Sequence, residues 1–117
     1  VANVEKIEIR LDKLLKEYNE FSKKKNTLQK ILYFAAYVHN EFQQIHPFED
    51  GNSRTARLIT FHLLRTQGVP IFDIPLGLLE QYLNATKGAK ERDDKNLNKV
   101  LQLIILYNLK TINEKLN

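Results

Sequence analysis

Residues 45–57 read IHPFEDGNSRTAR, and this stretch decides how the chain folds. Pro47 disfavours helical geometry in the residue before it, so a helix that arrives from the N-terminal side ends near Ile45 or His46. A new helix can begin only after Gly51, because glycine and its polar neighbours favour a turn. We therefore expect a tight loop that joins two helices.

Apolar residues recur at helical spacing on both sides of this loop. The spacing predicts helices over about residues 4–21, 26–45, 53–67, 76–87 and 95–116. Asn26 and Gln29 resemble a capping pair that opens the second helix. Only IFDI, at residues 71–74, could form a short strand. The predicted class is all-α, a helical bundle with the loop between its two central helices.

The composition fits one domain over residues 1–117. The chain has no cysteine, which excludes a disulfide framework and cysteine-bound metal and suits a reducing compartment, so we expect a cytoplasmic protein. No apolar run approaches the roughly 18 residues of a membrane span. The net charge of +4 allows an anionic partner, although a solvated basic surface is the simpler interpretation. Because the chain starts at Val1 and has no methionine, we expect a fragment.

Two arginines, Arg54 and Arg57, follow the loop at the start of the predicted third helix. A helix N-terminus carries partial positive charge, and a cation there costs about 0.3–1 kcal/mol. Their placement makes sense if an anion binds at the joint. Asn52 or Ser53 can cap the new helix, whose first amides have no partners inside the helix and would also face the anion. Two guanidinium groups suit a phosphate chain better than one carboxylate.

A plainer interpretation is that Glu49 and Asp50 neutralise the arginines as surface ion pairs, and the charges alone do not decide between the two. His46 favours the anion site, because an imidazole at its edge could accept a proton from a hydroxyl that attacks a bound phosphate. Asp50 suits Mg²⁺, which prefers one or two carboxylates together with substrate oxygens. These groups are sufficient for phosphoryl or nucleotidyl transfer.

The segment HPFEDGNSRTAR resembles the signature of Fic-domain proteins, the Fic/Doc or cell filamentation family, usually written HxFx[DE]GNGRxxR. The residues that match it are His46, Phe48, Asp50, Gly51, Asn52, Arg54 and Arg57. The motif is long and chemically mixed, and so it is specific. His39, seven residues before His46, also agrees with the family, and the resemblance covers at least residues 4–67.

The resemblance implies a protein adenylyltransferase, an ATP-binding transferase that moves AMP from Mg-ATP to a Ser, Thr or Tyr hydroxyl of a target protein (AMPylation). His46 would be the general base, and Asp50 would bind the Mg²⁺ on the α- and β-phosphates. Asn52 would be a second catalytic residue, bonded to the α-phosphate. The nucleotide-binding residues would be Gly51, Asn52, Ser53, Arg54 and Arg57. Within this set Arg54 would bind the β-phosphate, and Arg57 the γ-phosphate or a regulatory glutamate.

Ser53 departs from the family pattern, which has a second glycine at this position. If the position needs a positive φ, serine costs about 1 kcal/mol and can crowd the phosphates. If φ is helical, serine is harmless. The alternatives to AMP transfer are therefore a phosphotransferase or other nucleotidyltransferase of the same family, and a nucleotide-binding regulatory module impaired by Ser53.

Other features of the family are missing from these residues. The β-hairpin flap that docks the target is not predicted, because residues 1–26 read as helical, so we expect that the flap is absent from this chain or lies before Val1. The inhibitory pattern [ST]xxxE[GN] is absent too, so an inhibitory helix would lie outside these residues or on another, antitoxin-like protein. His39, Tyr82 and Phe48 are interpreted as core residues. A nucleic-acid partner is not expected, because no recognition motif accompanies the lysines.

Overall fold

The computed structural model describes residues 4–71, 74–87 and 91–116 of the chain. These residues form five helices and no strand: α1 (Val4–Ser22), α2 (Leu28–Ile45), α3 (Asn52–Thr66), α4 (Leu76–Ala85) and α5 (Asp94–Leu116). The predicted all-α class is confirmed. The strand considered for residues 71–74 lies partly outside the described residues, and its described ends, Ile71 and Ile74, are not in a strand.

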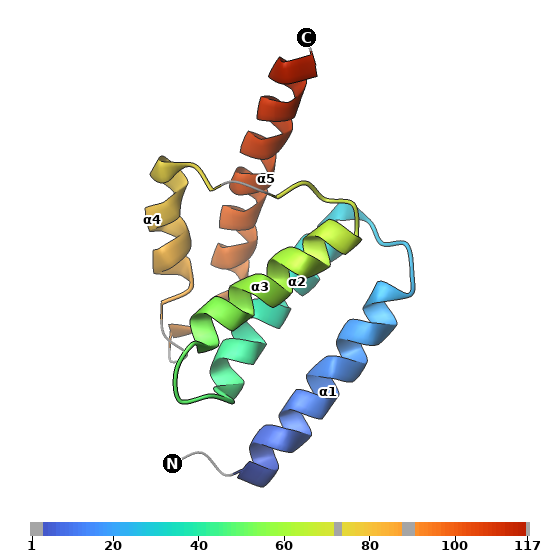
Figure 1. The fold of residues 1–117 in the computed structure, drawn as a ribbon, viewed down its shortest axis with the longest axis vertical. Coiled ribbons are helices and arrows are strands. Elements are labelled where there is room, and N and C mark those ends of the chain that lie inside the picture. Colours follow the sequence, from blue (N-terminus) through green and yellow to red (C-terminus); the bar gives the residue numbers. More distant parts are fainter. Residues whose placement is uncertain (1–3, 72–73, 88–90, 117) are drawn as a thin grey trace.

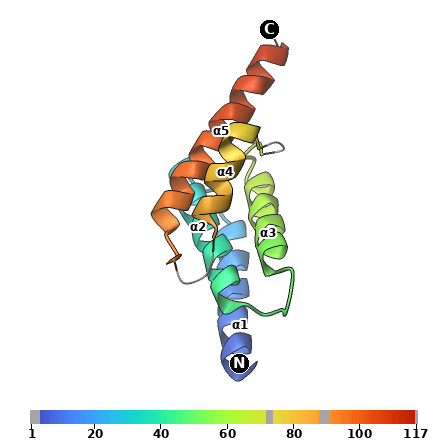
Figure 2. The same cartoon turned by 90° about the vertical axis from the view of Figure 1, so that its left-hand side faces the viewer.

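Helix α2 lies at the centre of the bundle. It packs against α1, α3 and α5, while α4 packs on α5 (Figures 1 and 2). The loop between α2 and α3 lies at the end of the molecule opposite the C-terminal end of α5, which extends beyond the other helices (Figure 1). In the described part of the chain, no helix has both the length and the apolar character that a membrane crossing needs.

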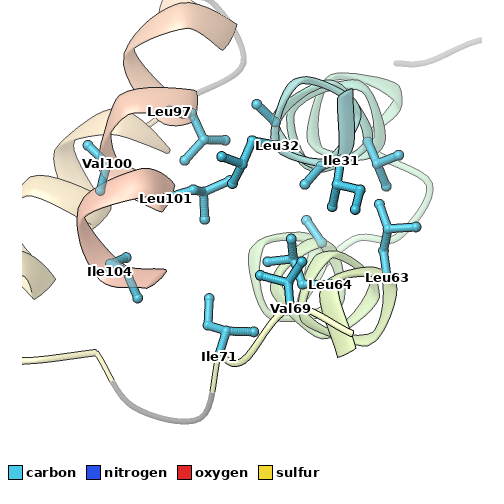
Figure 3. Packing of buried hydrophobic residues seen from close by; sticks show 14 of the residues in the cluster. Ile31, Leu32, Leu63, Leu64, Val69, Ile71, Leu97, Val100, Leu101 and Ile104 are labelled. Atoms are coloured by element: carbon cyan, nitrogen blue, oxygen red, sulfur yellow. The ribbon is translucent and has the colours of Figure 1, made fainter. Parts of the chain in front are cut away.

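The core forms where α2, α3 and α5 meet. Figure 3 shows Leu97 and Leu101 of α5 facing Leu32 of α2, with Leu64 of α3 completing the contact. Leu97, Leu101 and Leu64 have no exposed surface at all. Fully burying a leucine side chain contributes about 1.5–3 kcal/mol, so this cluster fixes α2 and α3 and, with them, the ends that meet at the loop.

The start of α2 corrects one prediction. Thr27, not Asn26, caps the helix, because the Thr27 side chain accepts a hydrogen bond from the Lys30 amide at 3.3 Å. The Asn26 side chain instead donates to the carbonyl oxygens of Phe21 and Lys24, at 3.0 and 2.9 Å. Asn26 therefore stabilises the end of α1, one helix earlier than the sequence pattern suggested.

Candidate active site

The loop begins at His46, which caps the C-terminal end of α2 in the left-handed conformation, with φ 55° and ψ 57°. Among the described residues, His46 is the only one other than glycine with a positive φ. Its amide donates to the Phe42 carbonyl oxygen at 3.2 Å, which closes the last turn before Pro47. This backbone turns the chain sharply away from α2 and leaves the imidazole exposed.

Gly51 supplies the second left-handed residue of the loop, with φ 82°. It is the N-cap of α3, and no side chain caps the helix, so the predicted capping by Asn52 or Ser53 is wrong. The physical reason is that Gly51 occupies the cap position and Asn52 is already helical. The first amides of α3 therefore have neither an intrahelical acceptor nor a side-chain cap, as an anion site requires.

Asn52 uses its buried side chain to hold the loop together. Its Oδ1 accepts a hydrogen bond from the Phe48 amide at 3.0 Å, and its Nδ2 donates to the Phe48 carbonyl oxygen at 2.7 Å. The same Nδ2 lies 3.2 Å from His46 Nδ1. Only 5% of Asn52 is exposed, so one amide group links the loop backbone to the candidate base.

Phe48 was expected to anchor the loop in the core, and this expectation is wrong. Its ring is 51% exposed and only touches the edge of the core, with its centroid 6.2 Å from that of Phe42. The hydrogen bonds from Asn52 to the Phe48 backbone do the anchoring instead. The loop is thus held by polar contacts, which leaves the space beside it open.

A cavity of about 320 Å³ lies beside the loop. Its lining includes six residues predicted from the sequence: His46, Asp50, Gly51, Asn52, Ser53 and Arg54. Gln43 and Glu49 complete it. No sequence pattern pointed to Gln43, whose side-chain amide donates to the Thr86 carbonyl oxygen at 2.9 Å and so links α2 to the end of α4.

Asp50 and Arg54 face each other only loosely. The shortest distance between Asp50 Oδ2 and Arg54 Nη2 is 3.9 Å, and the two side chains are 97% and 74% exposed. Such an exposed pair contributes little to stability. The pair realises part of the ion-pair interpretation, but it leaves both groups accessible to a ligand.

Arg57 is placed differently from Arg54. It does not line the cavity. Its guanidinium carbon lies 5.8 Å from the centre of the Tyr82 ring, in a cation–π contact with α4. Its Nε is buried, and no acceptor in the described part of the chain bonds to it. The structure therefore does not bring the two arginines together in one pocket.

Ser53 lies within α3 and has no positive φ. Of the two alternatives that the sequence left open, the structure therefore selects the helical one, in which serine costs no backbone strain. The side chain is exposed at the cavity. The positive φ that the loop needs is supplied by Gly51 instead.

The donor set at the cavity is poor for a resident metal ion. Within the described ranges, no three His, Cys, Asp or Glu side chains lie close enough together to hold an ion. Asp50 offers one carboxylate, whose Oδ1 accepts from the Gly51 amide at 2.8 Å. A single carboxylate with a free oxygen suits Mg²⁺ that arrives bound to phosphates and water.

A buried polar network that joins α2 to α4 and α5 has no equivalent in the sequence motif. His39 Nε2 lies 3.1 Å from the Tyr82 hydroxyl, and His39 Nδ1 lies 3.3 Å from Asn40 Oδ1. Asn40 Nδ2 donates to Asp94 at 2.8 Å, and Asp94 pairs with Arg92. The expectation that His39 and Tyr82 are core residues is confirmed, since they are 1% and 2% exposed.

A larger cavity, of about 630 Å³, lies between α1 and α3. Its lining is mainly apolar, from Leu11 and Leu14 of α1 to Leu58 and Phe61 of α3. It contains none of the residues predicted for the site, so the larger of the two cavities is not the candidate site.

The chain is similar in sequence to Drosophila proteins named protein adenylyltransferase Fic. It is 42% identical to a protein adenylyltransferase Fic of Drosophila mojavensis over 72 residues, which is 62% of this chain and 14% of that protein. It is 43% identical to the Drosophila persimilis protein of the same name over 60 residues, or 51% and 12% of the two chains. It is 40% identical to the Drosophila melanogaster protein over 72 residues, or 62% and 14%.

The matched region thus spans about a seventh of the length of these relatives. No solved structure matches the chain. The model of the Fic/DOC family matches residues 1–64, which include α1, α2 and the loop that lines the cavity. On the strength of this match over more than half of its length, the chain belongs to the Fic/DOC family.

Proposed function

We propose that this chain transfers AMP from Mg-ATP to a Ser, Thr or Tyr hydroxyl of a target protein. The observation that carries the proposal is the cavity in which His46 faces the uncapped start of α3. The names of the Drosophila relatives, protein adenylyltransferases, support the same reaction.

In the proposed reaction, the oxygen of the target hydroxyl attacks the α-phosphorus of ATP. A new O–P bond forms, the bond between the α-phosphorus and the oxygen that bridges to the β-phosphate breaks, and pyrophosphate leaves with that electron pair. His46 accepts the proton of the hydroxyl. A positioned general base of this kind contributes about 10²–10⁴-fold to the rate.

The start of α3 would bind the phosphates. Amides of Asn52 and Ser53 with no intrahelical acceptor, together with the helix dipole, favour negative charge at this point. Arg54, which is largely exposed beside them, would bind the β-phosphate. Because the Asp50–Arg54 contact is 3.9 Å long and exposed, little free energy is needed to separate the two groups.

Asp50 would hold the Mg²⁺ that comes with the nucleotide. When bound, Mg²⁺ neutralises charge on the phosphates. Asp50 would orient the metal-bound triphosphate through its Oδ2, while its Oδ1 stays bonded to the Gly51 amide. The proposal thus needs only one protein carboxylate.

Arg57 would act further along the triphosphate. Its guanidinium group lies against Tyr82 and outside the cavity, so it would have to turn toward the nucleotide before it could bind a γ-phosphate oxygen. The carboxylate of an inhibitory helix or of an antitoxin-like protein would compete for the same donor. We propose the inhibitory helix and the antitoxin-like protein as alternative regulatory partners. We also propose the cytoplasm as the compartment in which the reaction occurs.

The reaction is tested with ATP labelled at the α- or at the γ-phosphate. The targets are the chain itself and a mixture of acceptor proteins. We expect the α-label to become attached to protein, pyrophosphate to be released, and both to stop when EDTA removes Mg²⁺. Transfer of the γ-label would instead indicate a phosphotransferase. Nucleotide binding with no transfer of either label would indicate a regulatory module.

A further inference from the structure

We propose that Asn52 acts as a switch for the base: without nucleotide it holds the His46 ring with its proton on Nε2, and the α-phosphate of the nucleotide releases the ring. This inference rests on the proposed function and goes beyond it, because it gives Asn52 a positioning role that acts through His46. The consequence is that the base forms only when the nucleotide is in place.

The backbone of Phe48 fixes the orientation of the Asn52 amide. Backbone groups have fixed roles, since the N–H of Phe48 can only donate and its carbonyl oxygen can only accept. Both contact Asn52, at 3.0 Å through Oδ1 and at 2.7 Å through Nδ2. A flipped amide would place two donors together and two acceptors together, so the orientation is fixed.

The orientation of the Asn52 amide in turn decides the tautomer of His46. With this orientation, the group that faces His46 Nδ1 at 3.2 Å is the NH₂ of Asn52, which only donates. His46 Nδ1 must therefore accept, and the proton of the neutral ring must lie on Nε2. In this tautomer Nε2 has no free lone pair, and the lone pair of Nδ1 is already used. The nucleotide-free ring cannot act as a base.

A phosphate can release His46 from the Asn52 amide. Asn52 Nδ2 carries two hydrogens, and the bond to His46 is the longer of its two contacts, at 3.2 Å against 2.7 Å to Phe48. A phosphate oxygen is a stronger acceptor than a neutral imidazole, because charge-assisted hydrogen bonds are about twice as strong as neutral ones. The amide can therefore keep Phe48 and exchange His46 for phosphate. Solvent then removes the proton from Nε2 and returns one to Nδ1, which frees Nε2.

The test is nitrogen NMR of the chain labelled with ¹⁵N-histidine, in which the two ring nitrogens report where the proton lies. His46→Gln identifies the signals of His46 among the three histidines. Without nucleotide, we expect His46 to carry its proton mainly on Nε2. A saturating, non-hydrolysable ATP analogue with Mg²⁺ should move most of it to Nδ1, while the signals of His62, which lies outside the cavity, stay unchanged.

Two results would overturn the inference: a nucleotide-free His46 protonated on Nδ1, or no change of tautomer while calorimetry shows the analogue to be bound. If calorimetry shows no binding at all, the proposed function and the release by phosphate both fail, and Asn52→Asp then decides only whether the Asn52 amide sets the tautomer of His46. Its carboxylate accepts from Nδ1–H, so the variant should show the Nδ1 proton without nucleotide. Ser53→Asp adds the same single negative charge at an exposed position of the same cavity, so it is the matched control and should keep the wild-type tautomer, provided that circular dichroism shows both variants folded.

Discussion

Two histidines of α2, His39 and His46, each lie beside an asparagine amide, but the two amides point in opposite directions. Asn40 donates through Nδ2 to the carboxylate of Asp94, so its Oδ1 faces His39 Nδ1 and requires a proton there. Asn52 presents its NH₂ to His46 Nδ1 and requires that nitrogen to be bare. The same pair of residue types thus selects opposite tautomers at positions two turns apart.

The surroundings differ as well. His39 is 1% exposed, and its Nε2 accepts from the Tyr82 hydroxyl at 3.1 Å, so neither ring nitrogen is free. Burial raises the pKa of Tyr82 to about 12, which keeps that hydroxyl protonated and able to donate. His46 is exposed and lines the cavity with Nε2 not engaged by any described hydrogen bond. A histidine becomes available for chemistry when one nitrogen is fixed and the other is open.

Of the changes at these two histidines, we expect the largest effect from replacing His46, and we expect it on activity. His46→Ala should lower the rate of AMP transfer by about 10²–10⁴-fold, because the proton acceptor is removed, and should change the stability by less than about 1 kcal/mol, because the side chain is exposed. Transfer of α-label and urea denaturation measure the two quantities. His62→Ala, an exposed histidine on α3, is the matched control, and an equal loss of activity there would contradict the assignment.

The reverse effect is expected for the buried histidine. His39→Ala should lower the free energy of unfolding by about 3 kcal/mol, because it leaves a cavity and removes the partners of Tyr82 and Asn40. Urea denaturation at pH 7 measures this loss. A variant as stable as the wild type would show that the polar network does not hold α2 to α4 and α5.

The pH dependence of stability sharpens the same difference. Burial lowers the pKa of His39 to about 4 from its ordinary value of 6.5, so the unfolded chain binds more protons than the folded one between these values. Stability should therefore fall as the pH falls from 6.5 to about 4, by up to about 1.4 kcal/mol per pH unit, and this contribution should be complete above pH 6.5.

His39→Gln should remove that contribution. The groups that face His39 are Asn40, Tyr82, Arg57 and Asp94, and of these Asp94 adds its own loss only at a lower pH. Burial opposes the charge of Asp94, but hydrogen bonds from Arg92 and Asn40 outweigh it and lower its pKa below 3.8. Urea denaturation between pH 7 and 4.5 therefore isolates His39. A slope that persists in His39→Gln would refute the assignment.

The smallest effect is expected at Ser53. The backbone of Ser53 is helical, so a glycine at this position would not relieve any backbone strain. The rate of AMP transfer in Ser53→Gly should therefore stay within about threefold of the wild type. The variant should be less stable by up to about 1 kcal/mol, since glycine is a poor helix former. A large gain of activity in Ser53→Gly would instead support the impaired regulatory module.

The sequence predicted those parts of the site that are contiguous in the chain. Six predicted residues between His46 and Arg54 line one cavity because a single loop with fixed backbone conformations carries them. Arg57 was expected beside Arg54, three residues away on one helical face. The structure directs it instead toward Tyr82, a partner on α4 that spacing along the chain cannot reveal.

The caps show the same limit. Asn52 looks like a helix cap by residue type, and only the three-dimensional loop shows that its amide is occupied by Phe48 and His46. The helices themselves were predictable, because their apolar spacing is long and regular. Local pattern thus specified the elements, while contacts between distant residues decided what each polar side chain does.

The backbone at the end of α2 has a consequence for how the chain can evolve. A left-handed residue is most comfortable as glycine, and the φ of 55° at His46 makes the imidazole the less stable choice by roughly 1 kcal/mol. Selection for thermal stability alone would therefore replace His46 with glycine. The persistence of the histidine at this corner would mark a lineage in which catalysis outweighs durability.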